Sequence, residues 1–278
     1  MKTPLAVLAN TRQRSSLWRS LVRQPVSFLA AVQFLTRIPV PSRCFPTSEA
    51  DSAVLLRSSV VYFPLVGALI GMVTASVILG AQQLWSIALA VLVALACEMI
   101  LTGALHEDAV ADFCDAFGGG WSRDDVLRIL KDSRVGSFGA TGLSMAILLR
   151  TAGLVALEPD QLLPATLASA TLGRWVILLV MKLLAPIPNR ASLARELGER
   201  LTWKELLIGS LLTVPGVVLW ALVSPYRIAV ALAALLFFVL LFVAYLRRRL
   251  GGVTGDCLGC ACYLAQIIVL FAASAKAP

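Results

Sequence analysis

Seven long apolar runs constrain the fold of this chain more than any other feature. They lie at roughly Val60–Leu79, Leu84–Leu105, Ser137–Leu157, Leu162–Ala185, Leu206–Val223, Ile228–Leu246 and Leu258–Ala273. Each is close to the roughly 20 residues that a helix needs to cross about 30 Å of hydrocarbon. Only 14% of the residues are charged, whereas about a quarter of a soluble domain is charged. Because a bilayer core offers no water to backbone groups, each run is expected to be helical. The chain is therefore predicted to be an all-α, polytopic transmembrane helix bundle of about seven spans.

Basic residues concentrate in alternate loops between these runs. Of the 24 Lys and Arg, 20 fall in the N-terminal region and in the loops at 106–136, 182–205 and 247–256, while the loops at 80–83 and 158–161 carry none. Loops rich in Lys and Arg stay in the cytoplasm. The pattern predicts a multi-pass protein of the cell inner membrane, with its N-terminus inside and its C-terminus outside. The net charge of +8 is then explained by loops that face anionic lipid, not by nucleic-acid binding.

The N-terminal region differs in pattern from the rest. Apolar residues alternate with arginines from Leu17 to Val40, which favours a helix lying in the membrane interface over one that spans it. We therefore divide the chain into a basic segment at 1–59, with an interfacial or re-entrant helix, and a transmembrane catalytic bundle at 60–278.

The segment HEDAVADFCDAFGGG, His106–Gly120, is the most informative polar motif. Asp108, Asp112 and Asp115 are spaced four and then three residues apart, which stacks them on one face of a helix. Stacked like charges repel, and Mg²⁺ binds such oxygen ligands, usually one or two carboxylates together with substrate phosphates. The motif predicts a divalent-metal site for phosphate chemistry at the cytoplasmic face, although a solvated helix face would show the same spacing.

Two residues at the start of this motif are candidates for proton transfer. His106 is the only histidine of the chain and is either a proton carrier or an interfacial polar residue. Glu107 points away from the face of the three aspartates, which disfavours it as a ligand of the same metal.

Two further motifs combine charges with glycines. In Leu130–Gly142, Lys131 and Arg134 could hold phosphates and Asp132 could add a carboxylate, and glycines spaced three apart would let another helix pack closely; an ordinary loop is the alternative. The glycines concerned are Gly136, Gly139 and Gly142. In Gly251–Gly259, Asp256 could complete a metal or ribose site, or Thr254 or Asp256 could simply cap the last helix.

Ionisable residues also interrupt the apolar runs. Glu98, Arg150 and Arg174 lie within them, and charges at membrane depth are costly and usually functional. Arg150 is a candidate structural partner for Glu98, although sequence alone does not show the pairing.

Five motifs in this order resemble the adenosylcobinamide-GDP ribazoletransferase family, also called cobalamin-5′-phosphate synthase. They are FLTRIPVP at Phe34–Pro41, YFPLVGALIG at Tyr62–Gly71, LTGALHEDAVADFCDAFGGG at Leu101–Gly120, KDSRVGSFGATG at Lys131–Gly142 and GGVTGDCLG at Gly251–Gly259. The chain departs from the family pattern at Ala109 and Ala116, where Gly is usual, and at Tyr263 and Gln266, where glutamates are common.

The resemblance implies a Mg²⁺-dependent transferase of phosphorus-containing groups. It would move the cobinamide phosphate of adenosylcobinamide-GDP to α-ribazole or its 5′-phosphate and release GMP. A homo-oligomer, or a complex with other corrinoid-pathway enzymes, is also expected. The implied roles are metal binding by Asp108, Asp112 and Asp115, proton transfer by His106 or Glu107, and substrate binding by Arg37, Lys131, Asp132, Arg134, Arg174 and Asp256.

Two other functions are compatible with parts of the sequence. An alcohol phosphotransferase of lipid synthesis also uses spaced aspartates, but its DG-x₂-AR pattern is absent because Asp112, not Arg, follows Ala111. A secondary transporter would use Glu98 and Arg174 at the membrane midplane, but such proteins often carry paired inverted repeats, and none stands out here.

Overall fold

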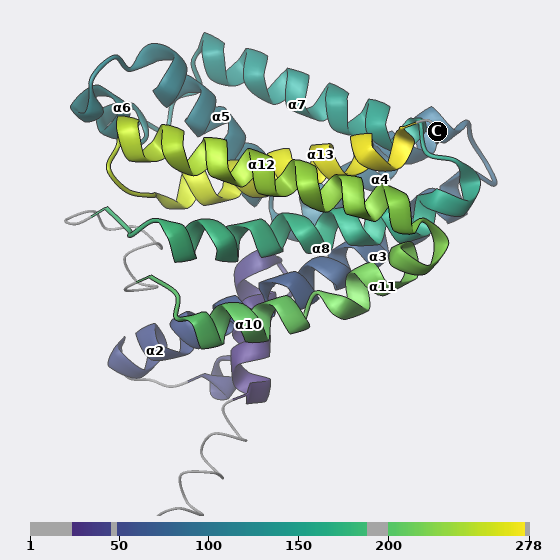
Figure 1. The fold of residues 1–278 in the computed structure, drawn as a ribbon, viewed down its shortest axis with the longest axis horizontal. Coiled ribbons are helices and arrows are strands. Elements are labelled where there is room, and N and C mark those ends of the chain that lie inside the picture. Colours follow the sequence, from purple (N-terminus) through teal and green to yellow (C-terminus); the bar gives the residue numbers. More distant parts are fainter. Residues whose placement is uncertain (1–23, 46–48, 188–199, 276–278) are drawn as a thin grey trace, which may run out of the picture.

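The computed structural model describes residues 24–45, 49–187 and 200–275, which are almost entirely helical (Figure 1). Three helices lie before or between the predicted spans: Gln24–Leu35, α2 (Glu49–Ser59) and α6 (Arg123–Ile129). The others are α3 (Phe63–Ala81), α4 (Ile87–Thr102), α5 (Leu105–Gly119), α7 (Ser137–Val155), α8 (Pro159–Leu183), α10 (Trp203–Leu211), α11 (Val214–Val223), α12 (Pro225–Arg249) and α13 (Gly255–Ser274). All seven predicted apolar runs are thus helical, and the predicted all-α bundle is confirmed.

Five of the helices are long and apolar enough to cross a membrane, and two bent pairs raise the number to seven if each pair is one span. The pair α10 and α11 bends by 53° at a point where Pro215, in the first turn of α11, has no backbone N–H to continue the preceding helix. The pair α4 and α5 bends by 90°, and this second break shapes the candidate site.

Helix α8 forms the centre of the bundle. Its most apolar stretch is 83% buried, against 28% for α7, and it packs against α3, α11 and α13. Small residues allow the close approach: a Cβ added at Gly67 of α3 would lie 2.5 Å from the carbonyl oxygen of Ala170 on α8. Close packing of small residues is a main source of helix association in lipid.

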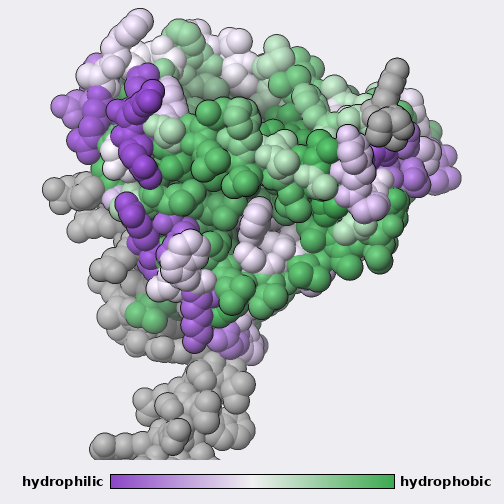
Figure 2. Space-filling view, in the orientation of Figure 1, coloured by the Kyte–Doolittle hydropathy of each residue, from purple (hydrophilic) through white to green (hydrophobic). Residues whose placement is uncertain are grey.

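The surface has the layering of a membrane protein. Figure 2 shows a face that is mainly hydrophobic across its middle and hydrophilic at its left and right edges. Large apolar side chains of α12, such as Leu236, Phe237 and Leu240, are more than half exposed. In water such a surface would be unfavourable, so this band faces lipid.

The break between α4 and α5 differs from the continuous run predicted at Leu84–Leu105. Helix α4 ends at Thr102, and the next two residues, Gly103 and Ala104, have φ values of 68° and 56°. Two successive left-handed residues turn the chain out of the helix axis. The acid-rich segment forms a separate helix, α5, packed against α7 and α13, as the helical spacing of its aspartates predicted.

The helix Gln24–Leu35 runs across the direction of α8 and α12 in Figure 1 (purple). At 1.5 Å per residue it is about 18 Å long, too short to cross a bilayer alone. The interfacial helix proposed for Leu17–Val40 begins outside the described residues, so that assignment stays a prediction.

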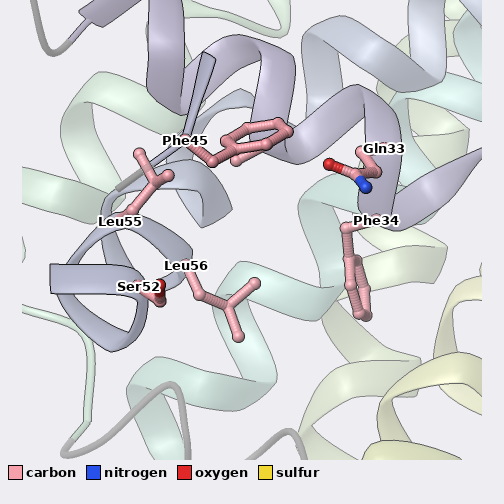
Figure 3. A pocket seen from close by; sticks show the side chains of 7 residues that line it. Gln33, Phe34, Phe45, Ser52, Leu55 and Leu56 are labelled. Carbon is pink, nitrogen blue, oxygen red and sulfur yellow. The ribbon is translucent and has the colours of Figure 1, made fainter. Parts of the chain in front are cut away.

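A cavity of about 340 Å³ lies between this helix and α2 (Figure 3). Its lining is largely apolar, consisting of Ala30, Gln33, Phe34, Phe45, Ser52, Leu55 and Leu56. None of these is a predicted site residue, so the cavity is separate from the polar motifs described next.

Candidate active site on helix α5

Helix α5 separates the polar residues of its motif onto two sides. Asp108 is exposed and Asp112 and Asp115 are half-buried, whereas His106 and Glu107 are only 3% and 5% exposed. Because the segment is helical, the three aspartates share one face, and Glu107 points away from them into the bundle. The helix therefore carries an outer acidic face and an inner side with ionisable groups.

Asp115 has a structural partner on α7. Its two carboxylate oxygens accept hydrogen bonds from the backbone N–H groups of Gly136 and Gly139, at 2.6 Å and 2.7 Å. A carboxylate is favourable at a helix N-terminus, where N–H groups lack partners within the helix. A Cβ at Gly139 would lie 2.1 Å from the carboxylate oxygen, and one at Gly142 2.3 Å from the sulfur of Cys114. The predicted close packing at these glycines is confirmed.

Helix α13 runs antiparallel to α5. At the end of α5, Arg249 donates to the carbonyl oxygen of Gly120 at 2.6 Å, which joins this end to the turn that leads into α13. Further along, a Cβ at Gly259 would lie 2.5 Å from that of Ala109. Asp256, one turn before Gly259, therefore belongs to the same end of the bundle as Asp112. The N-cap of α13 is Thr254, whose hydroxyl accepts from the N–H of Cys257.

The loop before α7 carries an ion pair of its own. Arg134 contacts Asp132 at 2.6 Å, and its side chain is 87% exposed. The hydrogen bonds from Arg134 lower the pKa of the Asp132 carboxyl to about 2, so this carboxyl stays ionised. Lys131 is exposed beside them.

Arg37 lies at the break before α5. Its backbone N–H donates to the carbonyl oxygen of Leu101 at 2.7 Å. Its exposed side chain covers Gly103, where a Cβ would be 2.1 Å from the guanidinium nitrogen Nε. The positive φ of Gly103 is the feature that favours glycine there.

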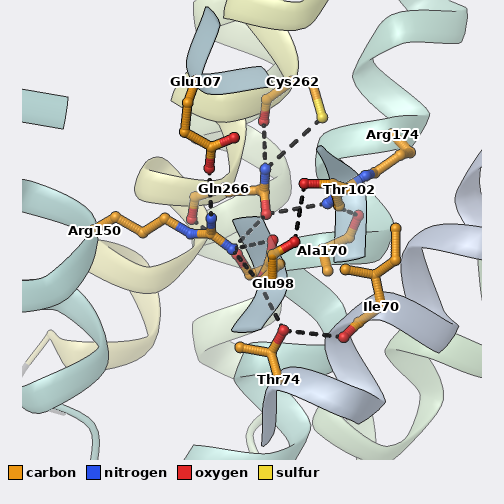
Figure 4. Close-up of polar contacts among 11 residues, drawn as sticks. Ile70, Thr74, Glu98, Thr102, Glu107, Arg150, Ala170, Arg174, Cys262 and Gln266 are labelled. Carbon is orange, nitrogen blue, oxygen red and sulfur yellow. Dashed lines mark hydrogen bonds and ion pairs between the residues drawn. The ribbon is translucent and has the colours of Figure 1, made fainter. Parts of the chain in front are cut away.

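A buried polar cluster joins the inner side of α5 to five other helices (Figure 4). We define this buried cluster as Thr74, Glu98, Glu107, Arg150, Arg174 and Gln266. Nη2 of Arg150 lies 2.7 Å and 2.8 Å from the two carboxylate oxygens of Glu98. The predicted partnership of these two residues is confirmed.

Gln266 connects the two arginines of the buried cluster. Its side-chain oxygen accepts from Arg150 and from Arg174, each at 3.1 Å, and Arg150 also lies over the ring of Tyr263. Both positions that depart from the family pattern in α13 therefore contact this cluster. Gln266 and Thr74 were not predicted to belong to a polar cluster, although a glutamine inside an apolar span is itself a signal of a buried partner.

Arg174, predicted to bind substrate, is 1% exposed. The structure thus groups it with Glu107 in the buried cluster. It places Arg37 at the α4–α5 break, Asp256 at the same end of the bundle as Asp112, and Lys131, Asp132 and Arg134 in the loop before α7.

The acidic face of α5 is the predicted binding site for Mg²⁺, and its carboxylates are the candidate ligands. Among the described residues, no three His, Cys, Asp or Glu side chains are arranged to hold a metal. Mg²⁺ does not need such a set, because it commonly uses one or two carboxylates, waters and substrate phosphates. Asp108 and Asp112, one helical turn apart, fit a site of this kind, while Asp115 is engaged by α7.

Comparisons with known proteins point to one family. The family model for cobalamin-5-phosphate synthase matches residues 27–274. Three similar proteins are each named adenosylcobinamide-GDP ribazoletransferase. The one from Leptospira biflexa is 35% identical and covers 84% of this chain and 89% of its own. Those from Ralstonia pickettii and Vibrio cholerae are 37% and 36% identical, and each covers 87% of this chain and at least 90% of its own. No solved structure matches the chain significantly.

Proposed function

The chain belongs to the cobalamin-5-phosphate synthase family, and from this premise we propose that it is an adenosylcobinamide-GDP ribazoletransferase. In the proposed reaction a hydroxyl of α-ribazole, or of its 5′-phosphate, attacks the phosphate that carries cobinamide. A new P–O bond forms, the P–O bond to GMP breaks, and adenosylcobalamin or its 5′-phosphate results. The observation that carries the proposal is the family match over residues 27–274, which contains every predicted site residue. The lipid phosphotransferase and the transporter have no comparable support.

The acidic face of α5 is the proposed site of the diphosphate. Asp108 and Asp112 would hold Mg²⁺, and the ion would neutralise charge on the diphosphate and on the leaving GMP. Asp115 keeps α7 and its preceding loop against α5, which supports the position of Lys131 and Arg134 as phosphate-binding side chains. Arg37, beside the break, is a further phosphate-binding candidate.

Proton transfer is assigned to the first turn of α5. Oε2 of Glu107 has no hydrogen-bond partner among the described residues, so it retains capacity to accept the proton of the attacking hydroxyl. His106 is the other candidate. Both side chains are nearly buried, so the acceptor would have to bind directly against this turn.

We place the active site at the cytoplasmic face of the cell inner membrane. The support is the charge pattern of the loops, since the loop from α5 to α7 and the turn from α12 to α13 are both basic. Nucleotides and Mg²⁺ are present on that side.

The test is GMP release by purified protein supplied with the GDP-linked donor, α-ribazole 5′-phosphate and Mg²⁺. The Asp112→Asn variant is expected to lose about 100-fold or more of this activity, because removal of transition-state charge stabilisation has effects of that order. Asp160→Asn is the matched control, since Asp160 is an exposed aspartate in the first turn of α8.

The outcomes separate the reaction from the site. Absence of GMP release from folded wild-type protein would contradict the proposed function. Release that survives Asp112→Asn, or that is unchanged when EDTA replaces Mg²⁺, would leave the reaction standing and contradict the proposed metal site.

A further inference from the structure

The guanidinium of Arg150 contacts carboxylates on both sides of the break between α4 and α5. Glu98 lies on α4 before the break, and Glu107 lies on α5 after it. Nη2 of Arg150, from α7, is 2.7 Å from a carboxylate oxygen of Glu98, and Nη1 is 3.8 Å from one of Glu107. Figure 4 shows Arg150 between these carboxylates. The planar fork of arginine suits two partners in this way, whereas an ammonium is a single point of charge.

All three side chains are deeply buried. Arg150, Glu98 and Glu107 are 4%, 3% and 5% exposed. Ionic groups at such depth are weak evidence for stability, because desolvation offsets their attraction. Their best-attested use is to fix one arrangement among several that an apolar interface would allow.

The chain at the break does not itself fix the angle between the two helices. Gly103 and Ala104 leave the helical conformation, so no continuous hydrogen-bond ladder sets the angle between α4 and α5. Arg174, the other cation of the buried cluster, makes its hydrogen bonds to Gln266 and to the carbonyl oxygen of Ala170. Among the described residues, Arg150 is the cation that forms ion pairs on both sides of the break.

We propose that Arg150 is a positioning residue for the reaction: its guanidinium, held between Glu98 and Glu107, fixes the angle between α4 and α5 and thereby places the acidic face of α5. Arg150 acts through α5 and does not touch substrate. The inference rests on the proposed function, and its test includes a readout that does not depend on activity.

That readout is a distance across the break measured by pulsed EPR. Spin labels are attached to one protein that carries both Ile100→Cys and Gly119→Cys. These positions suit labelling because Ile100 is 76% exposed and a Cβ at Gly119 meets nothing closer than 3.6 Å. Of the native cysteines, those exposed or half-buried are first replaced by serine: Cys44, Cys97 and Cys114. The control is Arg227→Met, because Arg227 is a largely buried arginine that pairs with Glu158 at 2.8 Å away from the break.

Arg150→Met is expected to broaden or shift the distance distribution and to lower GMP release about 100-fold, the size of effect that a misplacement of roughly 1 Å produces. Arg150→Lys, which keeps the charge but not the fork, is expected to broaden it as well. Arg227→Met should change neither quantity. Glu98→Gln is the milder second variant, which keeps Arg150 in place and weakens its hold on α4, together with the hydrogen bond that Glu98 accepts from Thr74 of α3.

Two results would overturn the inference. One is a wild-type distance distribution in Arg150→Met and Glu98→Gln; the other is a wild-type distribution in Arg150→Lys, which would show that charge alone suffices. If the wild-type protein releases no GMP, the proposed function fails, while the distance measurement still decides whether Arg150 sets the angle.

Discussion

Two neighbouring carboxylates on one helix face have different surroundings, and this difference is testable. Asp115 accepts two backbone hydrogen bonds from the start of α7, whereas Asp112, one turn earlier, is proposed to bind metal. Asp115→Asn removes the charge and one acceptor oxygen of a half-buried side chain, so we expect it to lower the free energy of unfolding by about 0.5–1.5 kcal/mol, the usual net contribution of one hydrogen bond. Asp112→Asn should change GMP release far more than stability. Thermal unfolding of the purified variants, beside GMP release, measures both effects.

The opposite pattern would reject this division of roles. An Asp115→Asn variant with unchanged unfolding but abolished Mg²⁺ dependence would mean that Asp115 is primarily a metal ligand. Asp108→Asn, at an exposed position of the same face, is the reference for the effect on unfolding.

The pair Asp132 and Arg134 gives a prediction about pH. Because Arg134 lowers the pKa of Asp132 to about 2, any contribution of this ionised pair is complete above the usual aspartate value of about 3.9 and is lost only as the pH falls towards 2. The difference in KM for the GDP-linked donor between wild type and Arg134→Gln should therefore be constant between about pH 6 and pH 8. Kinetics at three pH values in this range test it. A difference that changes with pH would show that a group other than the ionised Asp132–Arg134 pair governs the effect of the substitution.

Residue types and their spacing predicted which polar side chains share a helix face, but they did not predict all the partners of these side chains. The shared face of Asp108, Asp112 and Asp115 followed from helical period, and the pairing of Glu98 with Arg150 was a candidate because two opposite charges in apolar runs need each other. The role of Asp115 at α7 was not predictable, because it depends on where the start of α7 comes to lie, which is a tertiary property.

At the scale of elements, the α4–α5 break is a strained connection. Ala104 is the non-glycine residue with positive φ in the described part of the chain, at 56°. An L-residue with a Cβ loses roughly 1–2 kcal/mol in this conformation. Ala104→Gly should therefore raise the free energy of unfolding by up to about 1 kcal/mol, whereas Gly103→Ala should lower it because the φ of 68° at Gly103 disfavours a residue with a Cβ.

Unfolding midpoints of the two variants, measured in one detergent, test this account of the break. Equal effects of the same sign would contradict it. A raised midpoint in Ala104→Gly with reduced GMP release would further show that the strained angle serves the reaction.

The break also shows where element prediction from sequence ends. Leu84–Leu105 reads as one apolar run, because Gly103 and Ala104 are compatible with either a helix or a turn and hydropathy does not distinguish them. What decides between the two conformations is tertiary: Arg37 packs over Gly103, and Glu98 and Glu107 face the same guanidinium. The helices and their order were predictable from hydropathy. The direction of α5 was not, because it depends on these tertiary contacts.

At the scale of the whole molecule, the seven apolar runs and their alternating loop charge predict the bundle and its orientation together. The runs are helical as expected, and a hydrophobic band lies between two polar edges (Figure 2). The central place of α8 was not predictable from hydropathy, because its composition resembles that of the other runs and only its close packing with α3 and α13 distinguishes it.

The orientation determines which loops can be reached from outside the cell. The turn between α3 and α4 has no basic residue in Gly80–Gln83, whereas the loop after α5 has four basic residues. Each basic residue near an anionic leaflet contributes about 1 kcal/mol and resists translocation. Leu84 is 75% exposed and Trp121 is 93% exposed, so cysteines placed there report the two sides. In spheroplasts, a membrane-impermeant maleimide should label the Leu84→Cys variant directly and the Trp121→Cys variant only after permeabilisation.

The labelling uses the background without exposed or half-buried native cysteines, and a cytoplasmic marker protein monitors leakage. Labelling of Trp121→Cys in intact spheroplasts, with that marker unlabelled, would place the acidic face of α5 outside the cell. There it would be separated from cytoplasmic nucleotides, and the charge pattern would have given the wrong orientation. The expected result instead places the basic loops, the end of α5 and the start of α13 on one side of the membrane. A nucleotide-linked substrate must be able to reach that junction for Asp108, Asp112 and Asp256 to act together.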